Sequence, residues 1–597
     1  MPTRGRDPPS SPSAFSRPPK IAKMDDAVDI TEATTALAVG SGTSSRNTPV
    51  PSGRPDAKAR RYDRQLRLWA SAGQRSLESA RILLVGHDAV GCQALKNLVL
   101  PGVHHFTILS DAATTAADVA SNFFLEPTSI GQPIAKEEVR FLCELNPAVT
   151  GEARVADAGA LLDSDPAFYL SFNLIITSNV PPELEERIAE LLWQTSSKPE
   201  KPDIPLMSVR TSGLTGRLQI QVREHCVVDT HPDTTHTLRI DAPFPALEEY
   251  ACGLDLESMD SHVHSHIPWV VLLVRATSHW KASHSGNLPT SKEDKEEFKK
   301  LLNSWRMKHD EENFDEAVGQ SYRASVASEL PYDIAELIND PAIVNVSPSS
   351  KNLQILLHTL RRFMEVPPKL PPVAPSLPDM HSSTESYVKV QQLYKQAFQE
   401  DLAKFSSILT GVLKEIGLPE DAVSETEVEA FVKNVGGVAI VEGTSLLTAK
   451  AYEGGMKDRI EEDFPFGEGE ELMPGYGSEI SIVLAILASE QFYKAFGHWP
   501  GGTDGDMETD VAEVERFARK AMATVHAETD SDELPTKLTN AIGEVVRGGF
   551  LTPPNTAAFM GGIVGQEAIK LVTNQYQPLD NTVAIDLVKS GIEKFKL

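Results

Sequence analysis

A glycine-rich turn with an acidic residue at its centre is the segment of this chain best suited to chemistry. Residues 86–91 read Gly-His-Asp-Ala-Val-Gly and lie between an apolar stretch, 81–85, and an amphipathic helix pattern. In the related G-x-G-x-x-G turn, the middle glycine lets the backbone approach a phosphate at the N-terminus of a helix. Asp88 stands in place of that glycine and adds a side chain and a negative charge. The segment therefore predicts the strand–turn–helix of a phosphate-binding unit whose ligand site has been lost.

Cysteine and histidine residues are the next candidates, and neither set predicts a metal site. The cysteines form no C-x-x-C pair, which argues against structural zinc and against a disulfide framework. They are Cys92, Cys143, Cys226 and Cys252. His262, His264 and His266 alternate, as metal ligands on one side of an extended segment would. Because Asp260 is the only acidic residue close by, we expect a surface loop here instead of a metal centre.

Composition excludes several classes of partner. The chain has 597 residues, and 56 Lys and Arg against 84 Asp and Glu give a net charge of −28. Such a balance disfavours nucleic acid and anionic membrane surfaces. No apolar stretch approaches the roughly 20 residues of a membrane span. Residues 1–56 are rich in Pro, Ser, Thr and Gly and predict a disordered tail; their prolines oppose a transit peptide.

The elements that must position the turn alternate between strand and helix. Strands are expected at 81–85, 106–109, 174–177, 204–209 and 216–222. Helices between them are expected near 134–145 and 183–194. This alternation predicts an α/β fold with a doubly wound parallel sheet. The last of these strands alternates polar and apolar residues, which predicts one wet face.

The pattern changes to long amphipathic helices over residues 242–547. A helix is expected at 387–416 with Gly417 as its cap, after a connector at 367–378 that is half proline. The last fifty residues return to the first pattern, with a helix at 555–572 rich in small residues and a short edge strand at 582–585. The helical segment is therefore an insertion in the α/β domain.

Four motifs carry a resemblance to a known family. They are Tyr-Asp-Arg-Gln-Leu-Arg-Leu-Trp at 62–69, Lys-Asn-Leu-Val-Leu-Pro-Gly at 96–102, Ala-Ser-Asn-Phe-Phe at 120–124, and Gly-Gly-Ile-Val-Gly-Gln-Glu-Ala-Ile-Lys at 561–570. Together they resemble the activating enzymes of ubiquitin and its relatives, which are built on the ThiF/MoeB-type adenylation fold. Chain length and the large insertion make the chain most similar to the regulatory, amyloid-precursor-binding-type subunits of the heterodimeric enzymes that activate the Nedd/Rub modifier.

The resemblance implies a domain plan. Residues 57–241 and 548–597 would form a Rossmann-like adenylation domain, and 242–547 a mainly helical insertion like the catalytic-cysteine domain of the family. The family's catalytic cysteine is missing, because Cys252 does not match its motif and has acidic neighbours. We expect Cys252 to be inert.

The resemblance also implies that this chain binds neither nucleotide nor metal. Asn122 matches a residue that grips ATP in active members. The other matching positions have lost the acidic, cationic or glycine residue that ATP or its metal needs. They are Asp88, Ser110, Leu125, Ile134 and Ser178. Mg-ATP is then expected in the partner subunit.

One residue is expected to act in the partner's site. Arg64 matches an arginine that reaches across the dimer to ATP in the opposite subunit, and a guanidinium suits phosphate oxygens. The alternative is that Arg64 only pairs with a carboxylate at the interface. Arg67 is expected to be structural.

The junction between the proline-rich connector and the following helix is a second candidate contact. The residues expected to meet the partner are Asp379, Met380, Tyr387 and Lys389. The alternative is a solvated helix start, for which Ser382 and Glu385 form a plausible capping box.

The function implied is that of a catalytically inactive subunit without autonomous activity. Its partners would be a catalytic activating subunit, which requires an apolar dimer face, the Nedd/Rub-type modifier, and transiently a conjugating enzyme, in the cytoplasm or nucleus. The alternatives are an interaction scaffold derived from the same fold, or the equivalent subunit for another ubiquitin-like modifier. An autonomous dinucleotide enzyme is disfavoured by Asp88, Ser110 and Ser178.

Overall fold

The computed structural model describes residues 57–196, 203–229, 237–446, 459, 479–502, 506–525 and 534–597. The tail predicted at 1–56 lies outside these residues. The chain divides into two units, residues 1–61 and 62–597. Of the first unit, the structure describes helix α2 (Ala57–Arg61). The second unit contains every other element below.

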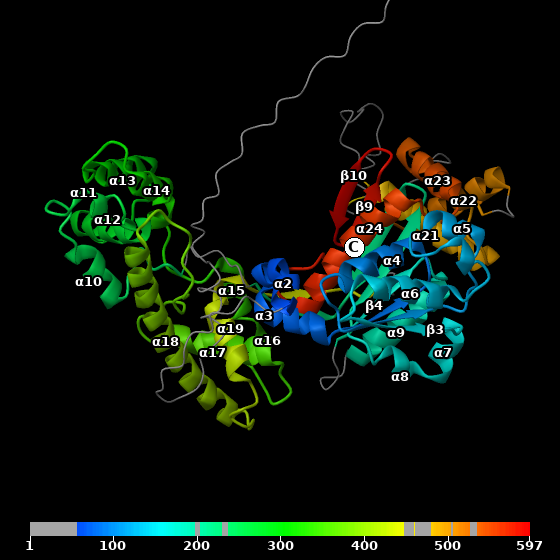
Figure 1. Ribbon diagram of the computed structural model, residues 1–597, viewed down its shortest axis with the longest axis horizontal. Helices are drawn as coiled ribbons and strands as arrows, with labels where there is room; N and C mark the ends of the chain where they lie inside the picture. Colours follow the sequence, from blue (N-terminus) through cyan, green and yellow to red (C-terminus); the bar gives the residue numbers. More distant parts are fainter. Residues whose placement is uncertain are drawn as a thin grey trace, which may run out of the picture. The chain divides into compact units, whose positions relative to one another are not determined.

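An eight-stranded sheet forms the centre of the α/β part (Figure 1). The strand order is β10-β9-β6-β5-β4-β1-β2-β3, and the strands from β3 to β5 in this order are parallel. The remaining neighbours are antiparallel. The strands are β1 (Arg81–Val85), β2 (His105–Leu109), β3 (Thr150–Arg154), β4 (Leu174–Ser178), β5 (Leu206–Ser212), β6 (Thr215–Gln221), β9 (Thr582–Asp586) and β10 (Gly591–Phe595). The predicted doubly wound parallel sheet is confirmed.

Helices cover both faces of the parallel strands. Ile82 and Leu84 belong to the core on one face, whereas Leu83 and Val85 belong to the core on the other, as the two-residue period of a strand requires. The first face carries α3 (Asp63–Ser79), α4 (Ala89–Val99), α6 (Ile134–Leu145) and α24 (Pro554–Thr573). The second carries α7 (Ala158–Ser164), α8 (Pro166–Tyr169) and α9 (Pro182–Ser196). Burial on both faces explains why these strands read as continuous apolar runs.

Two predictions about the antiparallel strands were wrong. All seven residues of β6 are buried, so the strand has no wet face. Helix α21 (Ile480–Phe496) covers it, and Arg217 of β6 forms an ion pair with Glu490 of that helix at 2.7 Å. Arg217 thus meets a charged partner instead of water, and Gln219 and Gln221 bond to groups of the chain. Strand β9 is not an edge, because β10 pairs with its outer side.

Three helices that we counted with the insertion pack on the sheet. Helices α21, α22 (Met507–Val525) and α23 (Thr536–Gly548) share one hydrophobic core with Ala584 of β9 and Phe595 of β10. The contacts therefore join this segment to the α/β part, although the predicted insertion extends to residue 547. The domain boundaries themselves stay a prediction.

The helical segment contains two further cores. One core contains residues of α10, α12, α13, α14 and the first half of α18. The other contains residues of α15, α16, α17, α19 and the second half of α18. The helices are α10 (Pro245–Gly253), α11 (Ser261–His264), α12 (Trp269–Ser283), α13 (Lys292–Ser304), α14 (Glu312–Gly319), α15 (Tyr332–Leu337), α16 (Pro341–Val344), α17 (Asn352–Glu365), α18 (Thr384–Glu415) and α19 (Glu425–Lys433). A two-stranded sheet, β7 (Glu224–Val228) with β8 (Val438–Glu442), borders the second core. Gly417 follows α18 with φ +77°, as predicted for its stop.

Shorter elements complete the described part. They are α5 (Ala116–Ser121) and the 3₁₀ turns η1 (Pro127–Ser129), η2 (Ser321–Ser325) and η3 (Val435–Gly437). The predicted proline-rich connector, 367–378, contains neither helix nor strand. Among the described residues, no helix combines the length and the apolar character that crossing a membrane would need.

Candidate functional site

The turn after β1 keeps the shape that the sequence predicts. Gly86 has φ +115°, and a Cβ at this position would lie 2.6 Å from the backbone oxygen of Ser178, so the turn requires glycine. Asp88 is the N-cap of α4, and its Oδ1 accepts a hydrogen bond from the backbone N–H of Gly91 at 2.9 Å. A carboxyl group of the chain itself therefore occupies the helix N-terminus, where a phosphate would bind.

Burial disfavours the charged forms of two acidic groups around this turn. Burial raises the pKa of Asp88, although the Ser178 hydroxyl, the Gly91 N–H, His87 and Arg210 all act in the opposite direction. Burial also raises the pKa of Glu138, on α6, well above its usual value, and the charge of Asp88 adds to that effect. Two acids whose ionised forms are disfavoured thus stand where a nucleotide site needs cations.

The serine hydroxyls at the strand ends next to the turn face groups of the chain itself. The hydroxyl of Ser110, at the end of β2, bonds to Nδ1 of His87 at 3.0 Å and accepts the N–H of Ala112 at 3.2 Å. Ser178, at the end of β4, is buried, and its hydroxyl acts on Asp88 without reaching good hydrogen-bond geometry.

The remaining predicted positions point to the interior. Leu125 is 8% exposed and Ile134 is fully buried, so neither presents a group to solvent. Asn122 is also buried: its Nδ2 donates to Oε1 of Glu138 at 2.9 Å, and its Oδ1 accepts the N–H of Phe124 at 3.0 Å. Asp88, Ser110 and Asn122 are therefore each bonded to other groups of the chain, namely Gly91, His87 and Glu138.

Glu138 is the residue of this cluster that sequence reasoning missed. It is fully buried, and Ile134, Ala135 and Leu142 are the other buried residues of α6. A glutamate in the apolar stripe of an amphipathic helix was the available signal, because a lone charge is rarely buried there without a partner.

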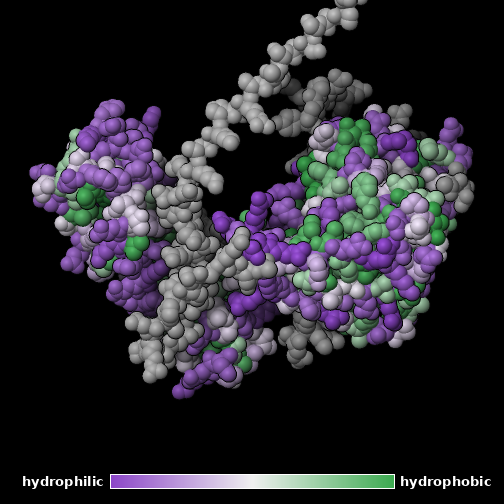
Figure 2. Space-filling model, viewed as in Figure 1, coloured by the Kyte–Doolittle hydropathy of each residue, from purple (hydrophilic) through white to green (hydrophobic). Residues whose placement is uncertain are grey.

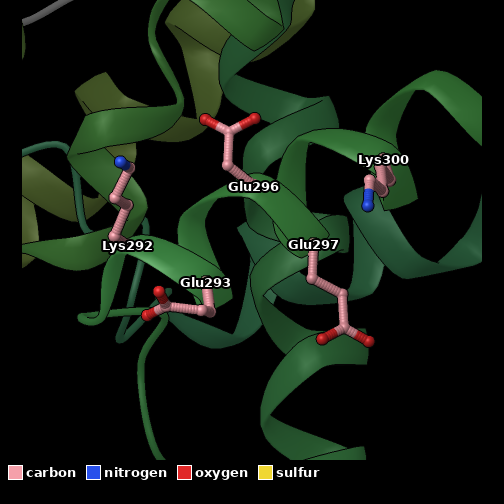
Figure 3. Close-up of a pocket in the computed structure, with 5 residues that line it drawn as sticks. All are labelled: Lys292, Glu293, Glu296, Glu297 and Lys300. Carbon is pink, nitrogen blue, oxygen red and sulfur yellow. The ribbon is translucent and has the colours of Figure 1, made fainter.

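A surface hollow of about 500 Å³ lies elsewhere, on the helical segment. It is lined by Lys292, Glu293, Glu296, Glu297 and Lys300, all from α13. Figure 3 shows their charged ends spread apart instead of converging on one point. This arrangement is that of a solvated helix face and offers no set of groups to hold a nucleotide.

Arg64 projects from a firmly anchored segment. Tyr62 is buried before α3, and its hydroxyl accepts a hydrogen bond from Nδ2 of Asn146 at 3.0 Å. At the other end, the backbone oxygen of Trp69 accepts Nε2 of Gln575 at 2.8 Å. Between these anchors Arg64 is exposed, and no hydrogen bond or ion pair holds its guanidinium within the described part of the chain.

Arg67 differs from Arg64 in having a local partner. Its Nε lies 3.1 Å from Oδ2 of Asp63, one helical turn earlier, and both side chains are largely exposed. Arg67 thus supports the first turn of α3, whereas no ion pair of this kind holds Arg64 on the same helix within the described residues.

The predicted partner-binding residues do not share one environment. Asp379 and Lys389 are exposed and Tyr387 is half-buried. Met380 is 7% exposed because its side chain packs in the chain's own core, and its contact with a partner stays a prediction.

The helix start at this junction differs from the predicted one. Ser383 is the N-cap of α18 and accepts the N–H of Ser386 at 3.1 Å. The predicted capping box of Ser382 and Glu385 is therefore one residue out of register.

The surface loop predicted at the histidine triplet is wrong for His264, whereas His262 is exposed and His266 is half-buried. His264 is fully buried in α11, and its Nδ1 lies 2.7 Å from Oε1 of Glu311, which is also fully buried. No group of three or more His, Cys, Asp or Glu residues is arranged for a metal ion in the described part of the chain. Cys252 is exposed on α10, where the guanidinium of Arg275 bonds the carbonyl oxygens at the helix end.

Known proteins similar to this chain agree on its family. The ThiF family matches residues 62–597. The NEDD8-activating enzyme E1 regulatory subunit of Xenopus laevis is 32% identical over 90% of this chain and 99% of its own length. Those of Gallus gallus and Drosophila melanogaster are 34% and 32% identical, over 89% and 90% of this chain and 96% and 98% of their own lengths.

Among solved structures, a crystal structure of PaaA covers 30% of this chain and 57% of its own, with 15% identity and a TM-score of 0.24. This likeness is too slight to add to the assignment, which rests on the family match and on relatives aligned along nearly their whole length. The chain belongs to the ThiF family and, within it, to the NEDD8-activating enzyme E1 regulatory subunits.

Proposed function

We propose that this chain is the catalytically inactive half of a heterodimeric NEDD8-activating enzyme. It supports ATP-dependent adenylation of the modifier's C-terminus and thioester formation on a catalytic partner subunit, and it binds no nucleotide or metal itself. The observation that carries the proposal is the Asp88 carboxyl group at the N-terminus of α4, bonded to the Gly91 N–H at 2.9 Å.

The chemistry of Mg-ATP supports the inactive assignment. A nucleotide triphosphate needs cations and backbone donors to neutralise and orient its phosphates. In this chain the helix N-terminus is filled, Leu125 and Ile134 are apolar and buried, and the nearby acids are disfavoured in their charged forms. Of the cations acting on Asp88, Arg210 is already paired with Glu185 and Glu490. His87, which also acts on Asp88, is bonded through Nδ1 to the hydroxyl of Ser110 at 3.0 Å.

Arg64 is the residue that this chain contributes to catalysis. Its guanidinium is always charged, carries a rigid fork of donors and projects from a segment fixed at Tyr62 and Trp69. A preorganised donor of this kind, placed against the phosphates in the partner's site, contributes about 10²–10³ in rate. The partner also supplies the reactive cysteine, since Cys252 sits among acidic residues.

Apolar surface on the α/β part supports heterodimer formation. Phe123 is 73% exposed and Leu551 66% exposed, and Ile130 and Phe559 are also exposed. Figure 2 shows hydrophobic residues gathered over the viewed face of this part, whereas the viewed face of the helical segment is mainly hydrophilic. Such a surface is typical of a protein that is paired with another chain.

Other contacts complete the proposal. Asp379, Tyr387 and Lys389 are exposed or half-buried at the start of α18 and face the partner or the modifier. The conjugating enzyme binds transiently after thioester formation. The net charge of −28 fits protein partners better than nucleic acid or membranes, and the enzyme acts in the cytoplasm or nucleus.

The test is ATP–pyrophosphate exchange with three preparations: this chain alone, the catalytic subunit alone, and the two together with NEDD8. We expect strong exchange with the mixture only. Exchange by this chain alone would refute the inactive assignment. An active mixture that accepts another modifier but not NEDD8 would instead make this the equivalent subunit of a different pathway, and a mixture no faster than the catalytic subunit would leave a scaffold role.

A further inference from the structure

Helix α3, which carries Arg64, is not one regular helix. Trp69 and Ala70 have non-helical backbone angles inside it, and they divide it by a kink. We propose that Gln575 and Tyr576 hold this kink, and with it the turn that carries Arg64, in the orientation that delivers the guanidinium to the partner's nucleotide site. The inference rests on the proposed function, because it concerns how Arg64 is placed for the role given to it there.

The kink is a strained part of the backbone. Ala70 has φ +53° and ψ −175°, a combination that glycine adopts readily and that a residue with a Cβ does not. Such a conformation persists only where the surrounding structure enforces it, and it is typical of functional sites. The side chain of Ala70 is exposed, so its own packing does not explain the kink. The enforcing contacts must therefore act on the neighbouring residues.

Two residues that follow α24 bond the backbone just before Ala70. Nε2 of Gln575 donates to the backbone oxygen of Trp69 at 2.8 Å, and the hydroxyl of Tyr576 donates to the backbone oxygen of Leu68 at 2.9 Å. Carbonyl groups at the end of a helical segment need such partners from elsewhere, because the interrupted helix no longer supplies them. Gln575 is buried, so water does not replace its bond easily. These two contacts are the ones that hold the chain in its kinked form.

The side chain of Trp69 is fixed as well. It is buried, and its Nε1 donates to Oε1 of Gln74, beyond the kink, at 3.0 Å. Nε2 of Gln74 donates in turn to the backbone oxygen of Pro101 at 2.9 Å. Together with the anchor at Tyr62, these bonds hold the turn that carries Arg64 at both of its ends.

The position of Arg64 depends on this backbone. Its side chain is exposed, and within the described residues no hydrogen bond or ion pair fixes the guanidinium. A displacement of about 1 Å in a catalytic group can reduce a rate by about 10²-fold. Gln575 and Tyr576 contact the segment that bears Arg64, so both are positioning residues.

The experiment measures NEDD8-dependent ATP–pyrophosphate exchange by the heterodimer, with radiolabelled pyrophosphate so that slow exchange stays measurable. Gln575→Ala removes the donor to the kink. Gln221→Ala is the matched control, because Nε2 of this buried glutamine also donates to a backbone oxygen, that of Ala189, at 2.9 Å on the other face of the sheet. Both changes are also made in a chain that carries Arg64→Ala, and the thermal midpoint of each chain shows that it is folded.

We expect Gln575→Ala to slow exchange by about tenfold or more and Gln221→Ala to leave it unchanged. In the Arg64→Ala chain, Gln575→Ala should have no further effect, because a positioning residue acts only through the group that it places. A merely structural role would instead slow exchange by the same factor in both backgrounds.

A second pair of variants tests the kink without changing its partners. Because Ala70 is exposed, Ala70→Gly and Ala70→Val alter the backbone preference and not a packed side chain. Glycine suits φ +53°, whereas the β-branched valine opposes it. We expect the exchange rate of Ala70→Gly to equal that of the wild type. Ala70→Val should lower the rate by about tenfold, again only when Arg64 is present.

Several results would overturn the inference. One is Gln575→Ala exchanging as fast as Gln221→Ala, and another is an equal further loss in the Arg64→Ala chain. Equal exchange by Ala70→Gly and Ala70→Val would also do so. If Gln575→Ala does not fold, Tyr576→Phe removes a hydroxyl alone and takes its place under the same criteria. Failure of the proposed function would look different, because Arg64→Ala itself would then exchange at the wild-type rate.

Discussion

Replacing Glu490 with alanine should detach α21 from the sheet. Oε1 of this buried glutamate accepts Nε of Arg210 at 3.0 Å and Nη2 of Arg217 at 2.7 Å. Both arginines are almost completely buried, on β5 and β6, and their charges lower the pKa of Glu490 in spite of its burial. The glutamate therefore neutralises two guanidinium groups at once.

The size of the effect follows from what remains after the change. Arg210 keeps Glu185 at 2.7 Å, whereas Arg217 loses its ion pair with Glu490. Removing one member of a buried ion pair typically costs about 3–5 kcal/mol, because desolvated charge is no longer balanced by the partner that was removed. We expect Glu490→Ala to lower the free energy of unfolding by about this amount, and Glu490→Gln by somewhat less because its amide oxygen still accepts one hydrogen bond.

Urea denaturation at neutral pH measures this loss. Glu515→Ala is the matched control, because Glu515 pairs with Arg519 at 3.0 Å on the exposed side of α22 and should cost less than about 1 kcal/mol. The folded-state pKa of Glu490 is depressed, so its contribution is present above pH 4.5 and is lost as the pH falls through the lower folded value. A Glu490→Ala chain as stable as Glu515→Ala would refute this account of how the sheet holds α21.

Three further changes test the packing and charge of the described chain. Burial raises the pKa of Glu479 to about 7, so its ionisation costs stability as the pH rises from 4.5 to 7. Glu479→Gln should raise the free energy of unfolding above pH 7 by about 1 kcal/mol after solvent screening and leave it unchanged below pH 4.5, which thermal scans on both sides of this range would measure. Burial lowers the pKa of His225 to about 4, so the free energy of unfolding should fall by about 2–3 kcal/mol as the pH is lowered from 6.5 to 4. Thermal scans of His225→Leu should show the loss of most of that pH dependence. Gly561→Ala places a Cβ 2.4 Å from Cβ of Gln93 and should destabilise the contact between α24 and α4. The added Cβ of Gly562→Ala meets nothing within 4 Å, so this variant should stabilise the helix by about 0.5–1 kcal/mol. Urea denaturation measures both changes. Equal effects of the two alanines would contradict the close packing.

Sequence patterns predicted the strands, helix and turn whose form depends on residues close together in the chain. The apolar runs of β1 and β4 identify buried parallel strands, and the period of α6 predicted its bounds, 134–145, because one stripe of the helix faces the sheet. The tight turn at Gly86 was also predictable, since the chain reverses where only glycine fits.

Long-range partners were not predictable from these patterns. The polar residues of β6 were predicted to face solvent because their partners lie far away in the sequence, as Glu490 does for Arg217 and Thr582 for Gln219. For the same reason His264 was predicted to lie in a surface loop, although it is buried beside Glu311, with which it pairs at 2.7 Å. Strand β10 was missed because Phe595 alone of its five residues is buried at the sheet edge, which leaves no apolar run. At the candidate site, sequence identified the lost positions but not that Glu138 and Asn122 bond each other inside it.

The central claim is that this chain has no working nucleotide site and lends Arg64 to its partner's. The most direct measurement is the rate of NEDD8-dependent ATP–pyrophosphate exchange by the heterodimer carrying Arg64→Ala, compared with Arg67→Ala from the same helix. We predict a fall of about 10²–10³ for Arg64→Ala and a nearly unchanged rate for Arg67→Ala, whose only described ion pair is with Asp63. A heterodimer in which Arg64→Ala exchanges as fast as Arg67→Ala would contradict the claim.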